Sequence, residues 1–103
     1  MDLVESFPAT GASGGVRSAT CYNFQVDGKQ VTVEVHNRAT HTRDGIMPAE
    51  KVQRAAKSFL ETEIERWGMA SLPNSVVLDS PTMDSVLNRL GCGQRFPRLA
   101  SLR

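Results

Sequence analysis

Two histidines and an aspartate lie close together in the stretch VHNRATHTRD, where His36, His41 and Asp44 carry side chains that commonly bind metal ions. A metal site requires such side chains to converge within about 2.0–2.2 Å of one ion. His36 is expected on the polar face of a strand and His41 in a loop, and neither an HExxH pattern nor a Cys/His pairing accompanies them. We therefore expect solvated or locally hydrogen-bonded histidines, and no metal or other cofactor.

Catalysis would need a nucleophile, a base and a group that orients them, all within hydrogen-bond reach. The sequence has no Ser-His-Asp pattern and no paired-carboxylate pattern. Gly11, Gly14 and Gly15 have no predicted strand before them, so they do not form the context of a nucleotide-binding loop. We therefore expect that the protein is not an enzyme.

One carboxylate falls on the apolar side of a predicted helix. At about 100° per residue, Glu63 lies about 20° from Val52, inside the arc of apolar residues. Such a carboxylate either reaches solvent at the helix end or is buried with a partner, because burying it unpaired costs several kcal/mol. In a homodimer, Arg66 or Arg89 of the second copy would pair with it. This makes Glu63, Arg66 and Arg89 candidate interface residues.

A predicted loop and the C-terminal tail are both basic. Uncompensated arginines bind phosphates, so Arg38, Arg43, Arg95 and Arg98 are candidate nucleic-acid contacts. On the helix between the loop and the tail, acidic residues at i,i+4 spacing neutralise the basic ones. Most aromatic residues are expected in the core, which leaves only Phe96 near the tail to stack on bases. Nucleic acid is therefore the alternative partner.

The stretch FQVDGKQVTVEV predicts a β-hairpin with its turn at Asp27-Gly28. A two-residue type I′ turn needs positive φ angles at both positions, and Asp and Gly tolerate them. The turn sets the register: Val26–Lys29, Phe24–Val31, Tyr22–Val33 and Thr20–Val35 face each other on one side, and Asn23–Thr32 and Cys21–Glu34 on the other. The first side is largely apolar and must be covered, because a hairpin alone is only marginally stable.

A long amphipathic helix follows the hairpin and provides this cover. Pro48 is tolerated at a first helical position, and Gly68 ends the helix after Trp67. The apolar face consists of Val52, Ala55, Ala56, Phe59, Leu60, Ile64 and Trp67. Residues 75–79 predict a short third strand, and Ser80-Pro81 predicts the start of a second helix that stops at Gly91.

These elements predict the α+β class, with a small antiparallel sheet covered by one long helix and with a second, short C-terminal helix. We expect residues 1–17 to form a flexible N-terminal segment, residues 18–93 a single globular domain, and residues 94–103 a mobile basic tail. The VDGK turn, the AAKSFLETEIERWG helix and the LPNSVVLD segment resemble the plan of several families of small bacterial proteins of unassigned function. This resemblance implies no site residues.

Composition and charge narrow the function further. The chain has 103 residues, 40% of them hydrophobic, and a net charge of +1, so no overall charge draws it to nucleic acid or membranes. Cys21 and Cys92 lie outside any paired motif, which favours a reducing compartment, and no apolar run approaches the about 20 residues of a membrane span. We expect a cytoplasmic protein without membrane contact.

The expected function is a non-catalytic module that forms a homodimer or binds a protein partner, because a small sheet leaves an unpaired edge that another chain can cover. The alternative is a weak nucleic-acid-binding protein that uses the Arg38–Arg43 loop and the basic tail.

Overall fold

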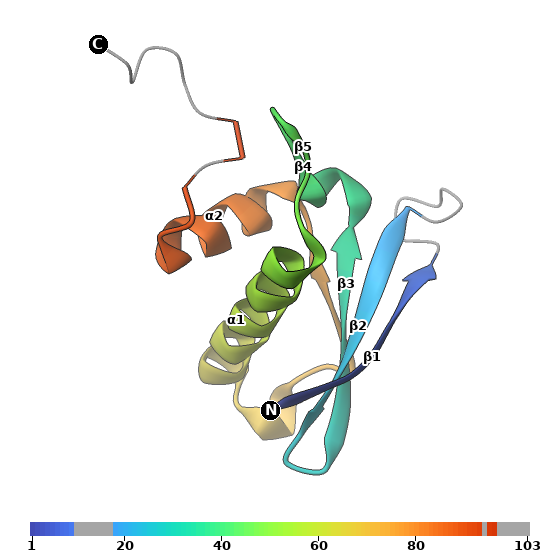
Figure 1. Cartoon of the computed structure of the whole chain (residues 1–103). Coiled ribbons are helices and arrows are strands. Elements are labelled where there is room, and N and C mark those ends of the chain that lie inside the picture. The colour runs from blue at the N-terminus through green and yellow to red at the C-terminus, as the bar shows by residue number, and fades with distance from the viewer. Residues whose placement is uncertain (10–17, 94, 97–103) are drawn as a thin grey trace.

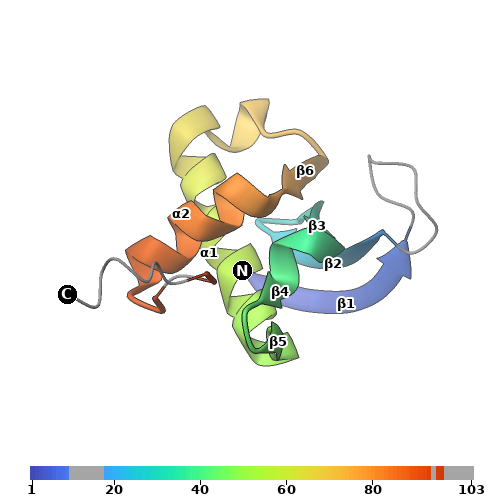
Figure 2. The same ribbon diagram turned by 90° about the horizontal axis from the view of Figure 1, so that it is seen from above.

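The computed structural model describes residues 1–9, 18–93 and 95–96. Within these residues, a four-stranded sheet has the order β1-β2-β3-β6, and both helices lie on the same side of it (Figure 1, Figure 2). The strands are β1 (Asp2–Ala9), β2 (Ala19–Val26), β3 (Lys29–His36) and β6 (Ser75–Leu78), and the helices are α1 (Ala49–Trp67) and α2 (Ser80–Leu90). The predicted α+β class is confirmed.

Three smaller features join the main elements. The short strands β4 (His41–Thr42) and β5 (Gly45–Ile46) form a separate two-stranded ribbon ahead of α1. The 3-10 turn η1 (Asn37–Thr40) links β3 to this ribbon, and η2 (Met69–Ser71) links α1 to β6. The ribbon and η1 lie at the end of the sheet where the first turn of α1 begins (Figure 1).

The hairpin of β2 and β3 has the predicted register. Phe24 lies opposite Val31 and Cys21 opposite Glu34. The turn residues Asp27 and Gly28 have φ angles of 47° and 80°, as the predicted turn requires. The agreement between turn chemistry and apolar alternation therefore predicted both faces of the hairpin correctly.

The long helix α1 covers the apolar face of the hairpin, as predicted. Its buried residues, together with the inward residues of the sheet, form one core, to which α1 contributes Val52, Ala55, Ala56, Phe59 and Leu60. The prediction that Trp67 belongs to this core is wrong, because its side chain is 52% exposed. Trp67 is the last residue of α1, and its indole N–H finds a hydrogen-bond partner at the surface instead.

The third strand is confirmed at Ser75–Leu78, but it runs parallel to β3, so the sheet is mixed. Val76 and Leu78 are buried and extend the face that the helices cover. An antiparallel arrangement was expected. The chain between β3 and β6 instead passes through α1, and a helical crossover of this kind joins parallel strands.

Strand β1 corrects the prediction of a flexible segment over residues 1–17. Asp2–Ala9 pairs antiparallel with β2, with an irregularity between Leu3 and Glu5, while residues 10–17 lie outside the described part of the chain. The strand escaped prediction because all its residues before Ala9 are exposed, so its sequence shows no alternation between core and solvent.

The second helix begins one residue earlier than predicted. Asp79, not Ser80, is its N-cap, and the Asp79 carboxylate accepts a hydrogen bond of 3.1 Å from the Thr82 N–H. Hydrogen bonds from Thr82 lower the pKa of Asp79, and the nearby His36 contributes less. Gly91 ends the helix in the left-handed conformation, with a φ angle of 70°, as predicted.

Candidate functional site

The candidate interface residues Glu63, Arg66 and Arg89 lie near one another where α1 ends. The Glu63 carboxylate accepts a 2.7 Å hydrogen bond from Trp67 Nε1, and the Arg66 guanidinium lies 5.2 Å from the centre of the Trp67 ring. Arg89 of α2 donates a hydrogen bond to the Thr62 hydroxyl of α1. We call Thr62, Glu63, Arg66, Trp67 and Arg89 the helix-end cluster. Its members find partners within the chain, so Glu63 needs no arginine from a second copy.

Arg95, a candidate nucleic-acid contact in the predicted mobile tail, is instead directed inward. Its side chain is 5% exposed, and its Nε lies 2.7 Å from the Asp84 carboxylate of α2. Its Nη1 donates to the carbonyl oxygens of Arg38, at 2.8 Å, and His41, at 3.3 Å. The prediction of mobility is wrong for Arg95, because these bonds fix its guanidinium. Arg98 and the other residues of 97–103 lie outside the described part of the chain.

The other two candidate nucleic-acid contacts, Arg38 and Arg43, are exposed on η1 and beside β4. The structure does not add Arg95 to them, because the Arg95 guanidinium is buried behind this segment and holds its carbonyl groups. Asp44 follows Arg43 directly and offsets part of its charge. Of the four candidates, Arg38 and Arg43 are therefore the described ones that are exposed to solvent.

The histidine pair has no metal-binding geometry. Among the described residues, no group of three or more His, Cys, Asp or Glu side chains is placed to hold a metal ion. His36 Nε2 lies 3.4 Å from the Glu34 carboxylate on the face of the sheet away from the helices, without the geometry of a hydrogen bond. His41 lies on β4, where it borders a pocket instead.

The β1 edge, which we define as the outward side of Asp2–Ala9, is an exposed strand edge. Strand β2 is the only neighbour of β1 among the described residues, so the backbone groups that point away from β2 have no partner strand. Three exposed apolar side chains lie on this strand: Leu3 at 36%, Val4 at 58% and Phe7 at 41%. None of the three was predicted as a site residue, because residues 1–17 were expected to form a flexible segment.

A line of polar side chains holds β1 in place. Asn23 of β2 donates a 2.9 Å hydrogen bond to the Glu5 carboxylate and accepts one of 2.6 Å from the Thr32 hydroxyl of β3. Asn23, in the middle of this line, is only 4% exposed, while Glu5 at its end is exposed. These hydrogen bonds connect β1, β2 and β3, and they direct the Glu5 carboxylate toward β2. Strand β1 is therefore held in place against β2.

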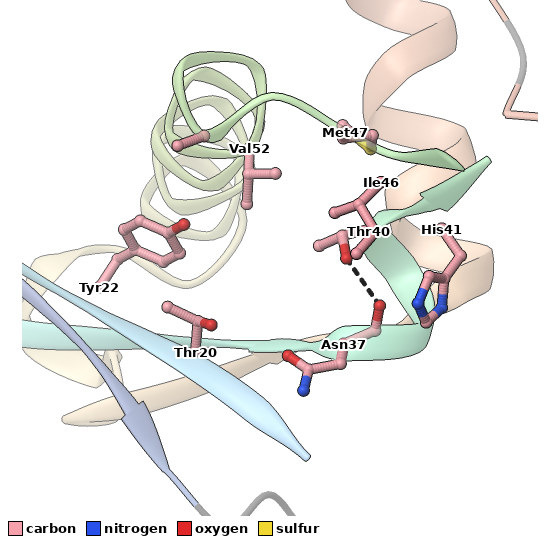
Figure 3. A pocket seen from close by; sticks show the side chains of 9 residues that line it. Thr20, Tyr22, Asn37, Thr40, His41, Ile46, Met47 and Val52 are labelled. Atoms are coloured by element: carbon pink, nitrogen blue, oxygen red, sulfur yellow. Dashed lines mark hydrogen bonds between the residues drawn. The ribbon is translucent and has the colours of Figure 1, made fainter. Parts of the chain in front are cut away.

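A pocket that we call the Tyr22 pocket lies beside strand β2. It has a volume of about 380 Å³ and lies between β2, the η1–β5 segment and the start of α1. Its lining residues are Thr20, Tyr22, Asn37, Thr40, His41, Ile46, Met47, Ala49 and Val52 (Figure 3). The alternation of apolar and polar residues in the hairpin predicts that Tyr22 lies in the core, but it does not indicate that the hydroxyl borders a pocket.

Comparison of the chain with protein-family models, with curated proteins and with solved structures gives no match. None of the helices in the described residues is long and apolar enough to cross a membrane. The β1 edge, the helix-end cluster and the Tyr22 pocket are therefore the features from which a function can be inferred.

Proposed function

We propose that the protein is a non-catalytic interaction module that self-associates by pairing the β1 edges of two copies. The proposal rests on the exposure of Val4 and Phe7 on a strand that has no neighbour on its outward side among the described residues. Unpaired backbone groups on such a strand form hydrogen bonds readily with another strand.

A second copy of the chain suits this edge because antiparallel pairing of two identical strands is self-complementary. Each copy donates and accepts the same set of backbone hydrogen bonds around a twofold axis. Pairing would join two four-stranded sheets into one continuous sheet and remove both β1 edges from solvent. The apolar side chains of β1 would gain neighbours across the new contact.

The charges of β1 permit this arrangement. Asp2 and Glu5 are its only charged residues, and two such strands would bring like charges together. The Glu5 carboxylate, however, is bonded to Asn23 of its own sheet, and Asp2 stands at the end of the strand. The Glu5 side chain is therefore directed over β2 and away from the outward side of the strand. Pro8 lacks a backbone N–H and limits the pairing to the residues before it.

Sedimentation equilibrium over a micromolar concentration series tests the proposal. The wild type should show a concentration-dependent rise in mass, and Val4→Lys should weaken self-association about tenfold or more, because lysine on an edge strand opposes pairing. Val77→Lys is the matched control. Val77 is 40% exposed on β6, the opposite edge strand, so the same substitution there should leave association unchanged.

Two outcomes would overturn the proposal. A wild type that remains monomeric throughout the series has no self-association to explain. Equal weakening by Val77→Lys and Val4→Lys would show that the β1 edge is not the contact.

A further inference from the structure

The Tyr22 hydroxyl is the accessible tip of a largely buried side chain, and it faces the Tyr22 pocket. The residue is 6% exposed, and in the described part of the chain its hydroxyl makes no hydrogen bond. Figure 3 shows the hydroxyl pointing away from β2 into the space bordered by Val52, Thr40 and Ile46. Burial raises the pKa of Tyr22, so the hydroxyl keeps its proton at neutral pH and is available as a donor. The hydroxyl is open to the pocket, so a molecule bound there can reach it.

The start of α1 adds a backbone donor, the Ala49 N–H, at the same pocket. Ala49, the first residue of the helix, belongs to the pocket lining. The N-cap residue is Pro48, which has no side-chain acceptor, and no side chain caps this end of the 19-residue helix. Lys51 and Val52 donate their N–H groups to the Pro48 carbonyl, but Ala49 and Glu50 have no backbone acceptor among the described residues. The positive end of the helix dipole lies here, and it favours a negatively charged group.

The remaining lining sets the size and charge of a ligand. No Asp, Glu, Lys or Arg is among the lining residues, and the His41 imidazole is the single basic side chain there, so the lining suits a singly charged group better than a doubly charged phosphate ester. One wall is apolar and consists of Ile46, Met47 and Val52, of which Ile46 is 71% exposed at the rim. A volume of about 380 Å³ falls at the lower end of the range for small-molecule sites. These features fit a singly charged acid with a small apolar body.

We propose that the Tyr22 pocket binds a small monocarboxylic acid, with the carboxylate held by the Tyr22 hydroxyl and the Ala49 N–H at the start of α1, and the apolar body against Ile46, Met47 and Val52. The carboxylate would satisfy donors from two elements at once, which are otherwise unpaired. The apolar body would cover the exposed side chain of Ile46. This site is independent of the β1 edge, since no residue of β1 lines the pocket.

Titration with acetate, benzoate and phenylacetate tests the inference. Tyr22 is the only tyrosine of the chain, so isotope-labelled tyrosine gives ring signals that report on this pocket alone. Benzoate or phenylacetate should shift these signals saturably and more strongly than acetate does, because acetate lacks the apolar body. Benzyl alcohol, which has the ring but no carboxylate, should bind at least about fivefold more weakly than benzoate, the equivalent of one lost hydrogen bond.

Two variants remove the proposed donors one at a time, and calorimetry measures the affinity of each for benzoate. Tyr22→Phe removes only the hydroxyl. Ala49→Pro removes only a backbone N–H at the first helical position, where proline is accommodated, and it leaves the Tyr22 side chain intact. Each variant should weaken benzoate binding about fivefold. Ser85→Ala, which removes a hydroxyl from the exposed side of α2 outside the pocket, should not change it.

The inference is overturned if none of the three carboxylates produces a saturable shift of the Tyr22 signals. It is also overturned if benzyl alcohol binds as tightly as benzoate, or if both Tyr22→Phe and Ala49→Pro bind benzoate like the wild type. Circular dichroism of each variant verifies folding, and if Tyr22→Phe does not fold, Ala49→Pro alone decides the matter.

Discussion

Arg95 forms an ion pair with Asp84 in which the arginine is 5% exposed and the aspartate 53%. The distance from Arg95 Nε to Asp84 Oδ1 is 2.7 Å, and the remaining guanidinium N–H groups reach backbone carbonyls of Arg38, His41 and Ser80. One side chain thus joins α2, at Ser80 and Asp84, to η1 and β4. A residue predicted to be mobile is therefore a structural link between α2 and the segment of η1 and β4.

Arg95→Ala should lower the free energy of unfolding by about 2 kcal/mol, because it leaves several carbonyls and a carboxylate without their charged donor. Chemical denaturation monitored by circular dichroism measures this loss. Arg43→Ala removes an exposed arginine from the same segment and should change the free energy by no more than about 0.5 kcal/mol. Equal effects of the two substitutions would contradict a structural role for the Arg95 guanidinium.

Phe59→Ala should cost about 3–5 kcal/mol of unfolding free energy, since Phe59 is 7% exposed in the core between α1 and the sheet. Trp67→Ala, on the last turn of the same helix, should cost about 1 kcal/mol or less, because this larger ring is half exposed and makes only surface contacts. Denaturation midpoints of the two variants compare the costs directly. A larger loss for Trp67→Ala would place the helix-end cluster, and not Phe59, at the centre of stability.

Glu63→Leu should leave self-association unchanged. The Glu63 carboxylate is bonded to Trp67 of its own helix, and the proposed contact lies on β1. The variant should alter only the fluorescence of Trp67, the single tryptophan of the chain, because its indole N–H loses an acceptor. Sedimentation of Glu63→Leu beside the wild type decides the question. A changed association constant would move the interface to the helix-end cluster.

Asp79→Ala should cost about 1 kcal/mol at neutral pH through loss of the α2 N-cap. Because the pKa of Asp79 is lowered in the folded protein, the ionised carboxylate favours folding. Its contribution is fully present above the ordinary pKa of aspartate and declines as the pH falls through that value toward the lower folded pKa. The stability gap between wild type and Asp79→Ala, measured in the same buffers, should therefore narrow in acid. A constant gap from neutral to acidic pH would exclude this linkage.

A labelled single-stranded oligonucleotide should show no steep salt-dependent binding, because the inward direction of Arg95 leaves Arg38 and Arg43 as the described members of the basic set that face solvent. Fluorescence anisotropy at several salt concentrations measures the slope of affinity against salt. A steep slope that becomes shallower when Arg38 and Arg43 are both changed to alanine would support the nucleic-acid alternative instead.

The features that could be predicted from the sequence depend on local chemistry. The Asp27-Gly28 turn and the alternation around it were enough to predict that Phe24 lies opposite Val31, because turn type and side-chain period act within a few residues. The apolar spacing from Val52 to Leu60 predicted the buried face of α1 for the same reason. The turn at Gly91 followed from the freedom of glycine to adopt positive φ angles.

Contacts between distant segments decided the rest. Strand β1 exists because β2 offers it a hydrogen-bonding edge, and its exposed residues carry no pattern that marks a strand. The parallel direction of β6 depends on the path of α1 between the strands, and the burial of Arg95 depends on Asp84 and on carbonyls up to 57 residues away in the chain. The open space at the Tyr22 hydroxyl likewise arises where three elements meet. Such features come from packing and hydrogen bonding between remote residues, which a local sequence pattern does not encode.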